Sequence, residues 1–235
     1  MPPTDQRAEV FSRIREALRR AAPHRHAPSP PGAIPGPGDG PPAANTFRNW
    51  LPAVGPSPDE QFALFASHCA QLRTELHILS SLDEAAGQLA LLARENSWRR
   101  IATHRHALAL PPAEKLALPT LITNEGYAVP DLEQCHAAIT GCDALVAQTG
   151  SILVSSGSAG GRALSVLPPH HIVIAQRGQI VPDLAAALSL ARERYAPGWP
   201  SFLSFITGPS RTGDIERILV LGAHGPKRLT VLIVP

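Results

Sequence analysis

The stretch HHIVIAQRGQIVPDLAAALSLARERY, residues 170–195, decides the fold class of this 235-residue chain. Its first part, HHIVIA, ends in a continuous apolar run. A half-exposed strand would alternate apolar and polar residues, so this run is typical of a parallel strand buried on both faces. The second part has helical spacing, and Pro182 stands near the predicted helix start. A buried strand followed by a helix predicts a helix-covered α/β sheet.

Strand and helix patterns continue on both sides of this stretch. The run LTVLIV, residues 229–234, is again apolar on both faces, and Phe62, Phe65 and Cys69 recur at helical spacing before the strand-like ELHIL. Several late strand candidates, such as SFLSFIT and RILVL, have no clear helix between them. We therefore expect an α/β domain with a mostly parallel sheet and a mixed part.

Composition changes sharply along the first quarter of the chain. Residues 1–21 can form an amphipathic helix, which we interpret as an appendage. Proline and glycine dominate residues 22–58, and neither a helix nor a strand ladder tolerates that composition, so we expect a linker there. Residues 59–235 then form the α/β domain.

Charge and cysteine content narrow the range of functions. The 21 basic and 19 acidic residues leave a formal net charge of +2, which gives no electrostatic reason to expect nucleic acid as a partner. Cys69, Cys135 and Cys142 form no closely spaced group, so an Fe–S cluster or a metal site on this chain alone is not expected. No apolar run is long enough to span a bilayer, and the start lacks the apolar core of a signal peptide, which favours a cytoplasmic protein.

The turn GPSRTGDIE, residues 208–216, can be interpreted in two ways. It follows a strand candidate and precedes a predicted helix start at Asp214, so its amide groups would point out at the positive end of the helix dipole. Arg211 adds a guanidinium group suited to carboxylate or phosphate, and Ser210 and Thr212 add hydroxyl groups, which favours an anion site. Alternatively, the hydroxyl groups cap the helix, and Asp214 and Glu216 complement its dipole.

Two further glycine-rich turns and a T-G-S stretch share this character. Arg162 leaves the turn GSAGG, and His171 comes shortly afterwards, next to a strand. His224 lies in GAHGP between two glycines, where proton transfer and plain exposure are both possible roles. Since open α/β sheets bind ligands at the carboxyl ends of their strands, we expect these turns to meet at that edge. Standard hydrolase, metalloprotease, P-loop and dinucleotide-binding motifs are missing.

The segments ITGCDALVAQTGSILVSS, GRALSVLPPHHIVIAQRGQIVPDL and FITGPSRTGDIERILVLGAHGPKRLTVLIV resemble the LUD domain of the lactate utilization protein C family. The resemblance implies a Rossmann-like α/β sandwich of the NagB/RpiA/CoA-transferase type. It also implies a role in oxidation of L-lactate to pyruvate together with Fe–S partner proteins. The positions that match the family's motifs are Thr149, Gly150, Ser151, Arg162, His171, Gly208, Ser210, Arg211, Thr212, Asp214, Glu216 and His224.

From these residues we expect a subunit of a lactate utilization system that binds a small anionic ligand. Arg211, the amides of residues 210–212 and Arg162 would hold the ligand, and His224 or His171 would transfer a proton. One alternative is a non-catalytic module that senses a metabolite or assembles Fe–S partners. Another is an enzyme of the CoA-transferase or isomerase type, which the fold alone suggests and for which Glu216 would be the nucleophile.

Overall fold

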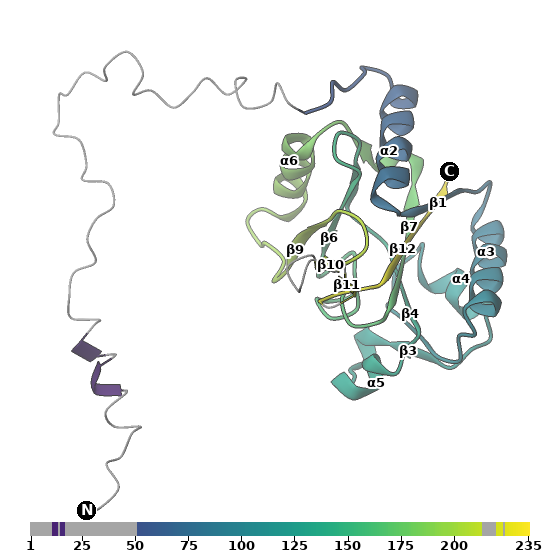
Figure 1. The fold of residues 1–235 in the computed structure, drawn as a ribbon, viewed down its shortest axis with the longest axis vertical. Helices are drawn as coiled ribbons and strands as arrows, with labels where there is room; N and C mark the ends of the chain where they lie inside the picture. The colour runs from purple at the N-terminus through teal and green to yellow at the C-terminus, as the bar shows by residue number, and fades with distance from the viewer. Residues whose placement is uncertain (1–10, 14, 17–50, 213–219, 223) are drawn as a thin grey trace, which may run out of the picture. The chain divides into compact units, whose positions relative to one another are not determined.

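The computed structural model describes residues 11–13, 15–16, 51–212, 220–222 and 224–235. The chain divides into two units, Met1–Trp50 and Leu51–Pro235. In the first unit, the described residues are helical and belong to the predicted N-terminal helix, whereas the rest of that helix and the predicted linker up to residue 50 lie outside the described residues. The second unit holds the sheets and helices labelled in Figure 1.

Six parallel strands form the main sheet of the second unit. Their order is β1–β12–β7–β4–β2–β3, and every neighbouring pair runs parallel. The two strands that the sequence marks as apolar on both faces, β7 and β12, lie side by side near the middle, and the predicted α/β class is thereby confirmed. The strands are β1 (Glu75–Ile78), β2 (Ile101–Thr103), β3 (Thr120–Ile122), β4 (Ala137–Thr140), β7 (His170–Gln176) and β12 (Arg228–Val234).

The predicted mixed part is a sheet of its own. Its order is β8–β5–β6–β9, with one parallel pair, β5 with β8, and two antiparallel pairs. A further antiparallel pair joins β10 to β11. The bounds are β5 (Ala144–Val146), β6 (Ser151–Ser155), β8 (Ile180–Val181), β9 (Leu203–Ile206), β10 (Arg211–Thr212) and β11 (Val220–Leu221).

Helices and the small sheet cover both faces of the main sheet. On one face, α3 (Leu82–Glu95) and α4 (Leu110–Glu114) pack with alternate residues of β4, β7 and β12. On the other face, the small sheet and α2 (Pro58–Leu72) pack on the intervening residues, as does α5 (Val129–Glu133). Figure 1 shows α6 (Leu184–Tyr195) beyond the small sheet, where Ala187 and Ala191 are buried against β5 and β6.

The chain reverses direction across the main sheet between β2 and β4. From β2 it passes through α4 to β3 at the edge, and it returns through α5 to β4 on the other side of β2. Because α4 follows β2 on one face and β5, which follows β4, packs on the other, the connections leaving the carboxyl ends of β2 and β4 diverge. Such a crossover point opens a crevice in α/β sheets.

Within the described residues, no helix combines the length and the apolar character that crossing a membrane requires. The three cysteines are buried, free and distributed over two separate core clusters. In the same part of the chain, no three His, Cys, Asp or Glu side chains come together in a way that could hold a metal ion.

Candidate functional site

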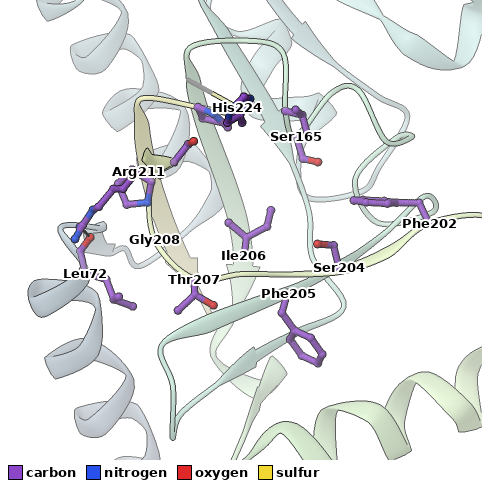
Figure 2. A pocket seen from close by; sticks show the side chains of 15 residues that line it. Leu72, Ser165, Phe202, Ser204, Phe205, Ile206, Thr207, Gly208, Arg211 and His224 are labelled. Atoms are coloured by element: carbon purple, nitrogen blue, oxygen red, sulfur yellow. Dashed lines mark hydrogen bonds between the residues drawn. The ribbon is translucent and has the colours of Figure 1, made fainter. Parts of the chain in front are cut away.

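A groove of about 470 Å³ lies between the small sheet and the β10–β11 pair. It is adjacent to the amino ends of β7 and β12, because Lys227, next to the groove, donates its amide hydrogen to the carbonyl of Pro169. Arg211, His224 and Thr207 surround the same hollow in Figure 2. The described residues that line this groove are Leu72, Ser165, Val166, Phe202, Ser204, Phe205, Ile206, Thr207, Gly208, Pro209, Ser210, Arg211, His224, Gly225 and Pro226.

The turn at residues 208–212 differs from the predicted strand-to-helix turn. The Ser210 amide donates to the carbonyl of Pro226 at 2.9 Å, and the Ser210 carbonyl accepts from Gly222 at 3.0 Å, so the turn opens an antiparallel ladder. The backbone of Thr212 belongs to the same ladder. The Ser210 amide is therefore not free for an anion. The predicted helix start, with Asp214 and Glu216, lies outside the described residues.

Arg211 reaches from this ladder to the end of α2. Its guanidinium group donates a hydrogen bond to the carbonyl of Leu72, and Figure 2 shows the side chain pointing that way. Gly208 makes the approach possible, because its φ is +85° and a Cβ atom there would lie 3.2 Å from Cβ of Leu72. Arg211 is exposed and forms no ion pair within the described residues, so no described carboxylate offsets its positive charge.

Arg162 borders the groove without lining it. Its guanidinium carbon lies 5.8 Å from the centre of the Phe202 ring, and one terminal nitrogen donates to the carbonyl of Ser201 at 3.5 Å. Phe202 is itself part of the groove wall. Arg162, Arg211 and His224 thus come from three separate turns and gather around one hollow.

The T-G-S stretch supports the groove from behind. Ser151 is buried, and its hydroxyl group lies 2.7 Å from that of Thr149 and 2.8 Å from that of Thr207, which lines the groove. Gly150 is required at this position, because its φ is +65° and a Cβ atom would lie 2.6 Å from Cβ of His68. These residues hold Thr207 in place and do not themselves form the groove wall.

His171, predicted as a proton-transfer residue, does not line the groove. The side chain is fully buried between the layers, and its Nε2 atom lies 2.9 Å from the Thr140 hydroxyl. Burial lowers the pKa of His171 to about 3, so the ring is neutral. Of the two predicted histidines, only His224 reaches the groove.

A second hollow, the cleft, opens at the opposite edge of the main sheet. Its volume is about 440 Å³, and its walls come from the segments that follow β2, β4 and β6 and from the end of α6. Asp143 is 2% exposed and accepts from Ser158, Arg194 and Tyr195 at 2.8, 2.8 and 2.5 Å. The cleft is lined by His106, Ala107, Leu108, Cys142, Asp143, Gly157, Ser158, Gln176, Gln179, Arg194 and Tyr195.

A buried and a half-buried imidazole ring follow β2 on this side of the cleft. Burial lowers the pKa of His104 to about 4, and the neighbouring His106 lowers it further; their ring centres are 5.2 Å apart. Burial also lowers the pKa of His106, against the opposing charge of Asp143. Gly160 leaves room for His104, since a Cβ atom there would lie 2.4 Å from Cβ of His104. Both rings are therefore neutral near pH 7.

This cluster was not predicted from the sequence. Asp143, His106 and Arg194 belong to no motif and lie far apart along the chain. The available signal was weaker: Asp143 and His106 each follow a short apolar strand by three residues, as polar residues at the carboxyl edge of a parallel sheet do. The three glycine-rich turns, which were expected to share that edge, are instead divided between the groove and the cleft.

The comparisons with known proteins decide the family. The model of the LUD domain matches residues 63–234, which is most of the chain. The chain belongs to the LUD domain family. Lactate utilization protein C of Geobacillus thermodenitrificans strain NG80-2 is 32% identical over 199 residues, covering 79% of this chain and 82% of the relative. The Bacillus subtilis strain 168 protein of the same name is 29% identical over 198 residues, covering 77% and 80%.

The LUD domain relatives also include a shorter match and a crystal structure. Lactate utilization protein C of Geobacillus sp. strain WCH70 is 39% identical over 104 residues, which is 43% of either chain. The crystal structure of a DUF162 family protein from Deinococcus radiodurans superposes with a TM-score of 0.61 at 25% identity. That superposition covers 76% of this chain and 99% of the other, which supports the α/β fold described above.

Proposed function

We propose that this LUD domain protein is a cytoplasmic subunit of a lactate utilization system and binds a small anionic metabolite in the groove. The relatives named lactate utilization protein C support the role in lactate utilization. The chemistry of the groove supports the anionic ligand, and the metabolite is a carboxylate or a phosphate-bearing compound.

The observation that carries the proposal is the set of donors around one hollow. Arg211 contributes a cation, and the side chains of His224, Ser210 and Thr207 contribute further polar hydrogens. Among the described residues no carboxylate lines the groove, so none of these side chains opposes a negative charge. A guanidinium group with hydroxyl and imidazole donors is a frequent combination around carboxylate and phosphate groups.

Oxidation of L-lactate to pyruvate removes two electrons and two protons from the substrate. In the proposed system, the electrons pass to Fe–S partner proteins, and this chain binds the anion. His224 lines the groove, and in the proposed reaction it exchanges a proton with the ligand.

Calorimetric titration tests the groove directly. The full chain is titrated with L-lactate, pyruvate and inorganic phosphate, and at least one of them is expected to bind. Arg211→Ala should weaken that binding about tenfold or more, because a charge-assisted hydrogen bond is lost. Arg99→Ala is the matched control, since Arg99 is exposed and lies in neither hollow. Unchanged affinity of the Arg211 variant for all three anions would contradict the proposal.

The burial of His171 favours a second candidate function. It removes one of the two predicted proton-transfer residues from the groove and leaves His224 alone. A module that binds the metabolite and assembles the Fe–S partners without turnover needs no acid–base pair. Copurification from the native cell, followed by a lactate oxidation assay with His224→Gln in the recovered complex, separates the two. Retained oxidation favours the assembly module, and loss of oxidation with intact assembly favours the catalytic subunit.

A further inference from the structure

The cleft lies where the topology of the main sheet favours a ligand. The chain leaves β2 toward α4 on one face of the sheet and leaves β4 toward β5 on the other, so the crevice opens beyond the carboxyl ends of β2 and β4. His106 follows β2 and Asp143 follows β4, and both line the cleft. Ligands in open α/β sheets bind in this position.

The hydrogen bonds of the cleft leave two donors available. Asp143 accepts hydrogen bonds from Ser158, Arg194 and Tyr195. Arg194 uses one terminal nitrogen for this contact, and its side chain is 46% exposed, which leaves the rest of the guanidinium group open. Asp143 raises the pKa of Arg194 despite the opposing effect of burial, so the guanidinium group stays charged.

His106 supplies the second donor. Its Nδ1 atom accepts the amide hydrogen of Leu108 at 3.3 Å, so the neutral ring carries its proton on Nε2. Gly141 leaves room for this part of the ring, because a Cβ atom there would lie 2.7 Å from Nε2. No described residue accepts a hydrogen bond from Nε2, and the half-buried ring lines the cleft.

The charge balance limits which anion can enter. Arg194 and Asp143 offset each other at 2.8 Å, and the neighbouring His106 is neutral. A ligand with two negative charges would face the buried Asp143 without a second cation to offset it. A single carboxylate instead matches the fork of Arg194 with one additional donor. Ala107, Leu108 and Cys142 provide apolar surface for the rest of a small molecule.

We propose that the cleft is a second ligand site, which binds a small monocarboxylate through the Arg194 guanidinium group and the His106 imidazole. Asp143 is a positioning residue that fixes Arg194, and Tyr195 and Ser158 fix Asp143 in turn. The cleft shares no lining residue with the groove, so this site stands or falls independently of the proposed function.

The test uses the full chain and two cleft variants. His106→Asn keeps an acceptor for the Leu108 amide and removes the Nε2 donor, so Asp143 retains all its partners. Calorimetric titration with propionate, L-lactate and pyruvate should show binding by the unmodified chain. Affinity should fall about tenfold or more in His106→Asn, as expected for loss of a hydrogen bond to a charged group. Arg194→Lys, which keeps the charge but not the fork, should also weaken binding.

Two controls locate the effect in the cleft. Arg192→Ala removes an exposed arginine of the same helix that points outside the cleft, and Arg211→Ala alters only the groove. Both should leave monocarboxylate binding in the cleft unchanged. The ring resonances of His106 should shift during titration with propionate and not with inorganic phosphate.

Three results would overturn the second site. The first is the absence of binding by any of the three monocarboxylates. The second is unchanged affinity in His106→Asn, which remains informative even where Arg194→Lys fails to fold. The third is binding of inorganic phosphate that shifts the His106 resonances as strongly as propionate does. Loss of groove binding in Arg211→Ala, by contrast, bears only on the proposed function.

Discussion

The groove and the cleft lie at opposite edges of the same sheet and differ in how their arginines are held. Arg211 in the groove contacts a backbone carbonyl, whereas Arg194 in the cleft is paired with a buried carboxylate. A carbonyl acceptor leaves the full positive charge of Arg211 for a ligand, and Asp143 offsets the charge of Arg194. The two arginines thus predict different ligands. The groove should tolerate a more highly charged anion, whereas the cleft should bind a monoanion.

Lowering the pH should have the largest effect on the free energy of unfolding. Histidine variants at the two edges should separate their contributions. Burial lowers the folded-state pKa of His104 and His170 to about 4 and that of His171 to about 3. In the unfolded chain each ring titrates near 6.5, as an exposed histidine does. Below pH 6.5 the unfolded state therefore binds more protons, so the stability present above pH 6.5 is lost as the pH falls toward 4.

Urea unfolding at pH 7.5 and pH 5 measures this loss. At pH 5 each of the three rings should cost about 2 kcal/mol, since one pKa unit corresponds to about 1.4 kcal/mol. His104→Asn and His170→Asn each remove one ring, at the cleft edge and at the amino edge respectively, and each should reduce the slope of stability against pH. A slope that neither variant changes would show that these rings are not held neutral.

A backbone change behind the groove should have the next largest effect. Gly150→Ala places a Cβ atom against His68 at a positive φ, so the free energy of unfolding should fall by about 1–3 kcal/mol. Groove binding should weaken, and cleft binding should stay the same. Gly87→Ala is the matched control, because Gly87 lies in α3 with open space around it and alanine favours a helix.

Thermal unfolding and anion titration of both glycine variants check this expectation. Gly87→Ala should raise the free energy of unfolding by about 0.5–1 kcal/mol and leave both hollows unaffected. If Gly150→Ala is as stable as the unmodified chain, the close approach to His68 does not constrain the T-G-S stretch.

The hydroxyl chain behind the groove should give the smallest effect. Thr207→Val breaks the hydrogen bond to Ser151 and should cost about 1 kcal/mol, with a loss of groove affinity. Thr120→Val removes a comparable hydrogen bond, from Thr120 to the carbonyl of Leu118, remote from both hollows. Chemical denaturation and titration of both variants test whether the chain of hydroxyl groups positions Thr207 or only stabilises the fold. Equal groove affinity in the two variants would show that the hydroxyl groups only stabilise the fold.

The sequence predicts the layers of this protein better than it predicts the edges. The apolar runs of β7 and β12 show that both strands are buried on two faces, and helical spacing identifies α6. The same apolar runs do not determine which strands pair with each other. β9 was therefore expected to end at the carboxyl edge of the main sheet, although it pairs antiparallel with β6 in the small sheet. That difference moves the turn with Arg211 to the opposite edge.

The cleft escaped prediction for a related reason. Its charged residues come from strand ends and from α6, and only the folded chain brings Asp143 within 2.8 Å of Arg194, fifty-one positions later. The groove residues Ser210, Arg211 and His224, in contrast, lie in glycine-containing turns that stand out in a single sequence. Motifs of local backbone geometry can be recognised along the chain, whereas a pair of isolated charges cannot.

One segment borders both hollows. Gly157 and Ser158 line the cleft, and Ser165 and Val166, a few residues later, line the groove. Between them, Leu164 is fully buried against β2 and β4, which ties the segment to the sheet. If a ligand at one end shifts this segment and so alters the wall at the other end, thermodynamic linkage makes the influence mutual: whatever factor one occupant applies to the affinity of the other, it receives in return.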